Sequence, residues 1–468
     1  MKQGFSKTKI VATIGPACES KTKIRRMIKA GVDVFRFNMK HGELAWHEEK
    51  VRLIREVSKE INRPVGIMID LQGPEIRVGK LDKNIELKRG QKVWLGKNIP
   101  IDNQAVLAAL KKGQKVLIDD GRLGLRVGLR KGKLVEAVVT KGGELKSRKG
   151  INIPELDCDI PTLVKRDLEC LSMENRNDVD WVALSFVSCA KDIKILRKEL
   201  KDKKMEAKII AKIERKAALD NFKEILEETD AVMVARGDLG VEISLYEVPF
   251  WQKHIIKQCR EAGKPVITAT EMLQSMVESS RPTRAEISDV ANAVYDGTDA
   301  VMLSGESAVG KYPIKAVEVM RREVSFSESK VEYEEVEITT KNMGQTAAIV
   351  TAANSLIDCG YRGVCDLSAV VVLTETGTTT RYLSRLRPKL PIIGVTANKK
   401  TRDQMKLMWG VKPFYFSFRR QSELSIRKIL KFLKKQKEIK VGENVVMIYG
   451  ELWGKPGLTS VVRIQVVV

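Results

Sequence analysis

The chain has 468 residues, 43% hydrophobic and 31% charged, which excludes a disordered protein and leaves room for two to four domains. Lysine and arginine outnumber aspartate and glutamate by 83 to 60, giving a formal charge of +23. That surplus suits anionic metabolites, nucleic acid or a membrane surface, but aromatics make up only 5%, which argues against a surface that stacks bases.

Seven cysteines are scattered along the chain with no CxxC pair and no spacing typical of a zinc site. They are Cys18, Cys158, Cys170, Cys189, Cys259, Cys359 and Cys365. Such a set predicts free thiols in a reducing compartment. No stretch approaches the apolar length that spans a membrane, and no long apolar run follows the lysine-containing N-terminus. We therefore expect a cytoplasmic protein without a membrane anchor.

Short runs rich in valine and isoleucine recur with helical patterns between them, and we expect eight of them to be β-strands. They are residues 8–14, 32–38, 65–70, 181–185, 208–213, 231–234, 265–270 and 300–303. Several are almost continuously apolar, as buried parallel strands should be. Eight strands alternating with helices predict a closed TIM (β/α)8 barrel.

The predicted barrel is interrupted once and followed by another domain. Residues 73–161 hold short alternating segments broken by glycines, which predicts an inserted β-rich lid, a small β-barrel. The barrel would then comprise residues 1–72 and 162–335. After the polar, acidic stretch 325–342, helical and strand patterns alternate again, so we expect a C-terminal α/β domain over residues 336–468.

The carboxyl ends of the predicted barrel strands carry polar residues, and active sites of this fold lie at that end. They are Arg36, Asn38, Asp70, Lys212, Glu214, Asp238, Thr270, Ser304 and Glu306. Lys212 and Glu214 share a strand face because side chains alternate with period 2. With Asp238 they suit Mg²⁺ and an anionic substrate. A structural ion pair at the barrel mouth is the alternative interpretation.

Seven motifs, in this order, resemble the pyruvate kinase family over nearly the whole chain. They are TKIVATIGPA at 8–17, RFN and HG within 36–42, GPEIR at 73–77, WVALSFV at 181–187, AKIE at 211–214, ARGDLGVE at 235–242 and the long segment at 282–313. The resemblance implies a barrel, a lid after the third strand and a C-terminal regulatory domain. It also implies a glycolytic enzyme, usually a homotetramer.

In that family phosphoenolpyruvate gives its phosphoryl group to ADP, forming ATP and an enolate that is protonated to pyruvate. By resemblance, Glu214 and Asp238 hold Mg²⁺ or Mn²⁺, and Lys212 neutralises charge on the transferred phosphoryl group. The N–H groups of Gly237 and Asp238 bind the substrate carboxylate, and the Thr270 hydroxyl assists, through a proton relay for the enolate.

The resemblance also assigns three arginines to phosphate groups, where a guanidinium offers two directed hydrogen bonds. Arg36 and Arg77 bind phosphate oxygens, Arg77 on the nucleotide side of the site. Arg166 aligns with a nucleotide-facing lysine of the family and keeps its charge.

The chain departs from the family at its site for monovalent K⁺. Lys40 stands in NMKHG where the family usually has serine, and Leu71 and Gln72 replace threonine and lysine. The missing serine hydroxyl and the carbonyl at position 71 would otherwise join Asn38 and Asp70 around K⁺. At about 4 Å an ammonium and K⁺ repel by about 4 kcal/mol at an effective dielectric of 20. The altered site therefore does not accommodate both cations.

We hypothesise that the Lys40 ammonium occupies the K⁺ position, pairs with Asp70 and makes activity independent of K⁺. The alternative is that Lys40 turns to solvent and leaves a weakened site. Glu75, which the family associates with K⁺ dependence, is retained and counts against the hypothesis.

A second departure concerns regulation. The loop TETGTTT at 374–380 resembles the family's phosphate cradle for a sugar-phosphate activator. The residues that would bind the effector are Thr374, Thr376, Gly377, Thr378 and Thr379. Glu375 stands where some members activated by sugar bisphosphates carry lysine, which favours a monophosphate effector or none. An ordinary strand-to-helix turn is the alternative.

Two rival functions remain open at this stage. A catalytically impaired relative kept for metabolite binding or regulation is suggested by Lys40, Leu71 and Gln72, although Lys212 and Glu214 are intact. A carbon-bond lyase on a similar barrel would lack the lid and the C-terminal domain. Nucleic-acid binding from the high charge stays open as a side activity. Loss of such binding at moderate salt, without sequence preference, would mark it as nonspecific.

Overall fold

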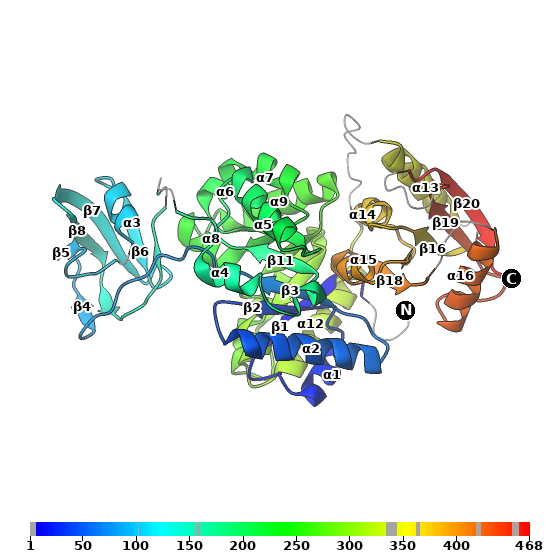
Figure 1. Ribbon diagram of the computed structural model, residues 1–468, viewed down its shortest axis with the longest axis horizontal. Helices are drawn as coiled ribbons and strands as arrows, with labels where there is room; N and C mark the ends of the chain where they lie inside the picture. Colours follow the sequence, from blue (N-terminus) through cyan, green and yellow to red (C-terminus); the bar gives the residue numbers. More distant parts are fainter. Residues whose placement is uncertain are drawn as a thin grey trace.

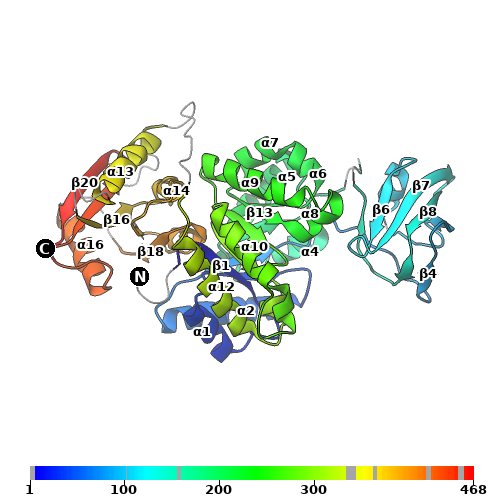
Figure 2. The ribbon, with the colours of Figure 1, turned by 180° about the vertical axis from the view of Figure 1, so that it is seen from behind.

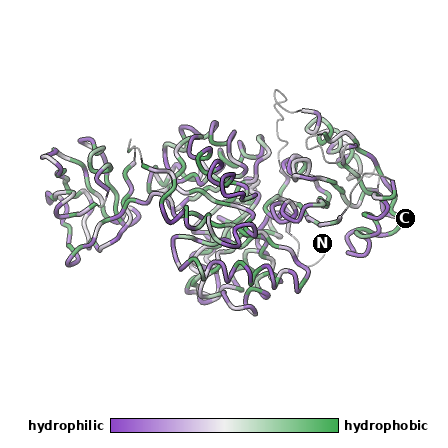
Figure 3. Tube along the Cα trace, in the orientation of Figure 1, coloured by the Kyte–Doolittle hydropathy of each residue, from purple (hydrophilic) through white to green (hydrophobic). Residues whose placement is uncertain are grey.

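The computed structural model describes residues 6–101, 103–154, 156, 160–333, 344–361, 366–417, 423–451 and 458–468. Figure 1 shows three bodies in a row, with the lid at the left, a barrel in the centre and the C-terminal sheet at the right. Hydrophobic segments concentrate inside each body, whereas the outer helices carry most of the hydrophilic ones (Figure 3).

The central body is a closed barrel of eight parallel strands. They are β1 (Lys9–Thr13), β2 (Val34–Asn38), β3 (Gly66–Asp70), β11 (Trp181–Leu184), β12 (Lys208–Ile213), β13 (Ala231–Ala235), β14 (Val266–Ala269) and β15 (Ala300–Leu303). Around the barrel they follow the order β1-β15-β14-β13-β12-β11-β3-β2. All eight predicted strands are therefore confirmed. Their residues are buried almost without exception, because one face fills the barrel and the other packs against helices.

Helices surround the barrel. They are α1 (Lys21–Ala30), α2 (Leu44–Glu60), α4 (Lys165–Cys170), α5 (Ala190–Asp202), α6 (Lys216–Asp220), α7 (Phe222–Glu228), α8 (Arg236–Glu242), α9 (Val248–Ala262), α10 (Arg284–Tyr295), α11 (Gly305–Ala308) and α12 (Pro313–Glu328). The view from behind shows α10 and α12 on the outside of the barrel (Figure 2). The sequence fixes helix starts locally: Thr283 and Glu286 form a capping box at α10, and the Ser20 hydroxyl accepts a hydrogen bond from Lys23 N–H at α1.

The lid is rich in β-strands, as expected. Its strands are β4 (Ile85–Leu87), β5 (Lys92–Leu95), β6 (Lys115–Ile118), β7 (Leu123–Lys131), β8 (Leu134–Lys141), β9 (Gly143–Leu145) and β10 (Ile151–Asn152), and its described part includes the helix α3 (Gln104–Ala109). Within the described part of the lid they form a five-stranded sheet, β10-β6-β7-β8-β5, and a separate pair, β4-β9. Closure of these strands into a β-barrel stays a prediction. The lid has its own apolar core.

The C-terminal body is a sheet of five strands in the order β18-β17-β16-β19-β20. The strands are β16 (Leu367–Leu373), β17 (Ile392–Thr396), β18 (Val411–Tyr415), β19 (Asn444–Tyr449) and β20 (Val461–Val466), the last antiparallel to β19. The helices are α13 (Gln345–Tyr361), α14 (Thr378–Arg385), α15 (Lys399–Gln404) and α16 (Glu423–Lys435). Separate apolar clusters lie on the two faces of the sheet. The predicted α/β fold is confirmed, whereas the exact domain boundaries stay predictions.

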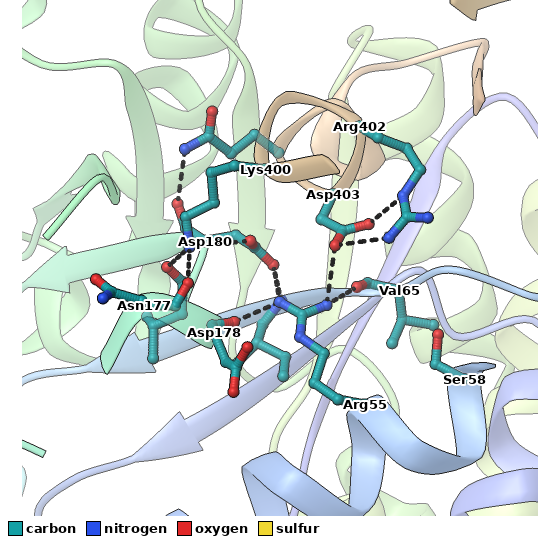
Figure 4. Close-up of polar contacts among 12 residues, drawn as sticks. Arg55, Ser58, Val65, Asn177, Asp178, Asp180, Lys400, Arg402 and Asp403 are labelled. Atoms are coloured by element: carbon teal, nitrogen blue, oxygen red, sulfur yellow. Dashed lines mark hydrogen bonds and ion pairs between the residues drawn. The ribbon is translucent and has the colours of Figure 1, made fainter. Parts of the chain in front are cut away.

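An ionic network joins the C-terminal body to the amino ends of the barrel strands (Figure 4). Arg55 of α2 contacts Asp180, just before β11, with 2.6 Å between Nη2 and Oδ2. Its Nη1 lies 3.3 Å from Asp403 Oδ2 on α15. Lys400 of the same helix reaches Asp180 Oδ1 at 3.4 Å and donates to the carbonyl of Asn177 at 2.6 Å.

The expected free thiols are present where the structure describes them, at Cys18, Cys170, Cys189, Cys259 and Cys359. Cys158 and Cys365 lie outside the described residues. Among the helices that the structure describes, none combines the length and the apolar character needed to cross a membrane.

Candidate active site

Lys212 lies at the centre of the polar cluster at the carboxyl end of the barrel. Its Nζ lies 2.6 Å from Glu214 Oε1 and 3.2 Å from Asp70 Oδ1, and it donates to Ser185 Oγ at 2.8 Å. Burial alone would lower the pKa of Lys212, but the carboxylates of Asp70, Glu214 and Asp238 outweigh burial and raise it above its ordinary value. Lys212 is therefore a fixed ammonium and not a general base.

Asp70 at the end of β3 joins this cluster to Arg36 on β2. Arg36 Nε donates to Asp70 Oδ2 at 2.7 Å, and Nη1 donates to the Thr13 hydroxyl at 2.9 Å. Burial opposes ionisation of Asp70, yet Lys212 and Arg36 together lower its pKa. The buried carboxylate of Asp70 thus pairs with two cations, Arg36 and Lys212. Together these two cations can attract an anion.

Glu214 and Asp238 lie close enough for their charges to interact. Burial and the Glu214 charge raise the pKa of Asp238 to about 7, although Lys212 acts in the opposite direction. Glu214 Oε2 accepts a hydrogen bond from Phe186 N–H at 2.7 Å, which fixes the carboxylate on its strand end. Two carboxylates that repel each other in a buried position provide hard oxygen ligands for a divalent cation.

Thr270 follows β14 and contacts the first turn of α8, the helix that carries Asp238. Its Oγ1 accepts a hydrogen bond from Gly237 N–H at 2.8 Å and donates to the Ala269 carbonyl at 2.6 Å. Gly237 lacks a Cβ, and one built there would lie 3.4 Å from Thr270 Oγ1, so glycine permits the close approach of α8 and the segment after β14.

A cleft between barrel and lid opens beside this cluster. Its lining includes Lys40 and Asp238 from the barrel and Glu75 and Asp120 from the lid side. Asp120 adds to the negative field at Asp238 and contributes to its raised pKa, after burial and Glu214. The lid therefore supplies part of the wall and part of the electrostatics of the site.

Three other predicted site residues hold neighbouring segments. Arg77 contacts Glu75 Oε2 at 2.7 Å and donates to the Arg148 carbonyl at 2.7 Å. Arg166 donates to the carbonyls of Met39 at 3.4 Å and Gly42 at 2.5 Å. The segments that these two arginines contact lie next to residues that line the cleft. The assignment of Arg77 and Arg166 to the nucleotide stays a prediction.

Comparison with known proteins gives one consistent result. The pattern described as "Pyruvate kinase, barrel domain" matches residues 5–317, and "Pyruvate kinase, alpha/beta domain" matches residues 359–465. The chain belongs to the pyruvate kinase family. It is therefore an enzyme that transfers phosphate.

Individual relatives extend over nearly the whole chain. The pyruvate kinase of Clostridium acetobutylicum is 38% identical over 475 residues, which cover 99% of this chain and 100% of that protein. Pyruvate kinase 2 of Synechocystis sp. is 38% identical over 483 residues, covering 98% of this chain and 79% of that protein. The crystal structure of a pyruvate kinase from Cryptosporidium parvum has a TM-score of 0.91 and 33% identity, covering 99% of this chain and 96% of that one.

The donor set at Glu214 and Asp238 fits the divalent metal that the family requires in general. The raised pKa of Asp238 is the observation that supports the fit, because a bound cation would relieve the repulsion that raises it. Within the described residues no group of three or more His, Cys, Asp or Glu is placed to hold a metal ion. Substrate oxygens or water would complete the coordination.

The residues of the altered monovalent-cation site do not pair as expected. Lys40 Nζ lies 3.0 Å from Glu75 Oε1, whereas the Asp70 carboxylate is engaged by Arg36 and Lys212. The predicted pairing of Lys40 with Asp70 is therefore wrong, because two stronger partners already bind that carboxylate. Asn38 Oδ1 accepts a hydrogen bond from Lys40 N–H at 3.2 Å.

The Leu71 carbonyl, expected as a cation ligand of this pyruvate kinase family site, has a partner within the protein. It accepts a hydrogen bond from Ser185 Oγ at 2.8 Å, and the Leu71 side chain is buried. Of the other strand-end residues, Glu306 is fully buried and accepts hydrogen bonds from the N–H groups of Leu273 and Ser304. Glu306 is a structural residue, outside the cluster around Lys212.

The effector-loop residues run from the end of β16 into the first turn of α14, which begins at Thr378. Gly377 adopts a φ of 82°, and its N–H donates to the Thr374 hydroxyl at 3.0 Å. The hydroxyls of Thr376 and Thr378 lie 2.9 Å apart, and those of Thr379 and Thr459 lie 2.7 Å apart. Hydroxyls and a left-handed glycine are thus brought together, as a phosphate cradle requires.

The effector loop also touches the barrel. Lys208, the first residue of β12, donates from Nζ to the Thr376 carbonyl at 3.4 Å. Burial lowers the pKa of Lys208 to about 8, partly offset by Asp230. The strand β12 also carries Lys212 near its carboxyl end. This one strand therefore contacts both the effector loop and the cluster around Lys212.

Sequence reasoning missed three residues near the site. Ser185 belongs to the same strand-end set and stands within a motif already noted, so its position was a usable signal. Arg236 directly precedes Gly237, but no sequence pattern indicates its contacts with the carbonyls of Ala269 and Thr270 or with the side chains of Gln252 and Asp289. Asp120 comes from the lid, and its approach depends on how the lid is placed.

Proposed function

We propose that the chain catalyses phosphoryl transfer from phosphoenolpyruvate to ADP with Mg²⁺ or Mn²⁺, forming pyruvate and ATP in the cytoplasm as a step of glycolysis. The observation that supports this proposal best is the contact of one buried lysine with two carboxylates, Lys212 with Glu214 and Asp70, beside a third carboxylate at Asp238. A fixed ammonium next to metal-binding carboxylates suits a transfer in which charge moves over phosphoryl oxygens.

Individual residues have separate roles in phosphoryl transfer and in protonation of the enolate. Lys212 and Arg36 stabilise negative charge on the phosphoryl oxygens, and Arg77 and Arg166 face the nucleotide once it binds. The Thr270 hydroxyl assists protonation of the enolate: a proton passes to the enolate carbon through a relay that includes the hydroxyl, and water replenishes it.

Glu214 and Asp238 would hold the divalent cation, which supplies positive charge for the substrate carboxylate and the phosphoryl group. The N–H groups of Gly237 and Asp238 would bind the substrate carboxylate. Gly237 N–H must then share or leave its hydrogen bond to Thr270 Oγ1. Binding of substrate and positioning of the Thr270 hydroxyl are therefore linked.

The test is pyruvate formation from phosphoenolpyruvate and ADP with Mg²⁺, run in parallel with K⁺ and with a bulky inert cation. Wild-type chain should turn over, and Lys212→Met should abolish turnover while still folding. Folded wild-type protein that binds phosphoenolpyruvate without forming pyruvate would favour the alternative, a catalytically impaired relative that binds metabolites.

For the monovalent cation we propose that the Lys40 ammonium, held by Glu75 at 3.0 Å, supplies the positive charge that K⁺ provides elsewhere in the family. Asn38, Lys40, Asp70 and Leu71 would form this altered site. Activity would then be independent of K⁺. Retention of turnover in the bulky cation supports this, and turnover only with K⁺ contradicts it.

Regulation and assembly are separate proposals. The cradle formed by Thr374, Thr376, Gly377, Thr378 and Thr379 would bind one phosphate of a sugar monophosphate, because the Glu375 carboxylate repels a second. A homotetramer is supported by exposed apolar side chains on the barrel surface, Leu245, Tyr246 and Phe250. Activation by a sugar phosphate and the mass in solution test the two proposals.

A further inference from the structure

Arg236 is the first residue of α8, the helix that carries Gly237 and Asp238, and it contacts the segment after β14 that carries Thr270. Its Nε donates to the Ala269 carbonyl at 3.3 Å, and its Nη2 donates to the Thr270 carbonyl at 2.7 Å. One guanidinium therefore holds two consecutive carbonyls at the end of β14. Because Arg236 is bonded directly to Gly237, it also fixes the start of the helix that carries Asp238.

The segment that Arg236 holds is strained. Thr270 has a φ of 68° and Glu271 a φ of 56°, so two consecutive residues with side chains adopt the left-handed region. For a β-branched residue such as Thr270 this conformation is uncommon and strained. It persists only where neighbouring groups determine it. Arg236 donates to the carbonyls of Ala269 and Thr270, and Gly237 N–H donates to the Thr270 hydroxyl.

Arg236 is itself anchored from two helices. Its Nη1 lies 2.6 Å from Asp289 Oδ1 on α10 and 3.3 Å from Gln252 Oε1 on α9. The side chain of Arg236 is about nine-tenths buried, at 11% exposure. The guanidinium is thus held in the barrel wall by side chains of two helices as well as by the two carbonyls.

The contact at Ala269 bears on the Thr270 hydroxyl. That hydroxyl donates to the same carbonyl as Arg236 Nε, at 2.6 Å. To pass on a proton, the hydroxyl must turn away from this buried carbonyl, and a buried carbonyl left without any donor is destabilising. Because Arg236 also donates to Ala269, the carbonyl keeps a partner.

We propose that Arg236 is the positioning residue that sets the Thr270 hydroxyl for proton transfer to the enolate, by holding the Ala269 and Thr270 carbonyls. This proposal rests on the proposed function and extends it to a residue without contact to substrate. In the step itself, a C–H bond forms on the enolate carbon, a proton leaves the relay, and water restores it.

The test compares Arg236→Lys with Thr270→Ala and with the double variant. An ammonium cannot span two carbonyls in the directed geometry of a guanidinium. Two readouts are used: steady-state turnover of phosphoenolpyruvate and ADP, and incorporation of deuterium into the pyruvate methyl group in D₂O with Mg²⁺ and ATP. Arg130→Lys is the matched control, because Arg130 also donates to backbone carbonyls, those of Leu107 and Leu110 in the lid.

Arg236→Lys should lower deuterium exchange by about 100-fold, the loss expected for a catalytic group displaced by about 1 Å. The KM for phosphoenolpyruvate should change far less than the exchange rate falls, because Lys212, Arg36 and the N–H of Asp238 still bind the substrate in its ground state. In the Thr270→Ala background the same substitution should have no further effect. Arg130→Lys should leave both readouts unchanged.

Exchange at the wild-type rate in Arg236→Lys would overturn the inference, as would losses that add in the double variant. Should Arg236→Lys not fold, Asp289→Asn loosens the anchor instead, and about a tenfold loss that vanishes in the Thr270→Ala background is expected. If the wild-type chain turns over and every variant matches it, the role of Arg236 is contradicted while the proposed function stands. A wild-type chain without turnover overturns the proposed function and this inference with it.

Discussion

The Lys40 ammonium lies 3.0 Å from Oε1 of Glu75, across the point where the chain leaves the barrel for the lid. The pair lines the cleft that also contains Asp238. Arg77 contacts the second oxygen of Glu75 at 2.7 Å, so this carboxylate bridges two cations. Lys40 therefore provides a positive charge at this position of the cleft.

Lys40→Ser should therefore convert the enzyme from K⁺-independent to K⁺-activated. Removing the ammonium leaves Glu75 with one cation fewer, and a hydroxyl ligand returns to the site. Turnover in a bulky inert cation should fall about tenfold, equivalent to ~1.4 kcal/mol, and K⁺ should restore it. Initial rates at a series of K⁺ concentrations measure this. Lys83→Ser, at an exposed lysine of the lid, is the control. An unchanged cation response in Lys40→Ser would contradict the role of Lys40.

Mg²⁺ binding should weaken as the pH falls below about 7. Burial and Glu214 raise the pKa of Asp238 to about 7, so protons compete with the cation for this carboxylate. Each pH unit below that value should reduce Mg²⁺ affinity by up to about tenfold. The raised pKa also means that, without Mg²⁺, this group contributes stability at low pH and loses it as pH rises through about 7.

The thermal shift caused by Mg²⁺ at about pH 6 and about pH 8 measures this competition. Asp238→Asn, which cannot titrate, should flatten the pH dependence and weaken binding at both values. Equal shifts at both pH values in the wild-type chain would show that Asp238 is not the group that the proton and Mg²⁺ share.

The barrel and the cluster around Lys212 could be predicted because local patterns determine them. Buried parallel strands require continuous apolar runs, and period-2 alternation places Lys212 and Glu214 on one face. The partner of Lys40 could not be predicted in this way. Glu75 lies beyond Gly73, whose φ of 67° reverses the chain, and Asp70 is already occupied by other cations.

Other features depend on contacts between distant segments. The left-handed conformation of Thr270 contradicts the preference of a β-branched residue, and tertiary contacts to Arg236 and Gly237 accompany it. The strand pairing of the lid is open for a related reason, since alternating strands do not determine which edges pair. Strand pairing is set by turns and register, which the glycines of this segment leave open.

Arg55→Met should destabilise the junction between barrel and C-terminal sheet. The substitution removes the guanidinium that joins the buried carboxylates of Asp180 and Asp403 (Figure 4). Asp180 keeps Lys400 and the N–H of Ile67, and Asp403 keeps Arg402, so the loss should stay below the ~3–5 kcal/mol of a fully uncompensated buried charge. Chemical denaturation followed by tryptophan fluorescence measures the change.

The control for this substitution is Arg25→Met, because Arg25 pairs with Glu60 at the protein surface. An exposed pair contributes at most about 1 kcal/mol. Asp403→Asn in the Arg55→Met background should recover part of the loss, since burial and the charge of Asp180 both disfavour the Asp403 carboxylate, which then keeps only Arg402. Equal losses for Arg55→Met and Arg25→Met would contradict a junction held by this network.

Lys9→Met should stabilise the protein most near pH 7 and progressively less toward pH 10. Lys9 begins β1 and donates from Nζ to the Val411 carbonyl of the C-terminal sheet at 2.8 Å. Burial lowers its pKa to about 7, partly offset by Asp33. Because the unfolded chain binds this proton up to about pH 10, folding releases it between the two values, and wild-type stability rises with pH there. Methionine removes that slope. Denaturant unfolding across this range, with Lys83→Met as the exposed control, should give curves that converge at high pH, whereas parallel curves would show that Lys9 stays charged when buried.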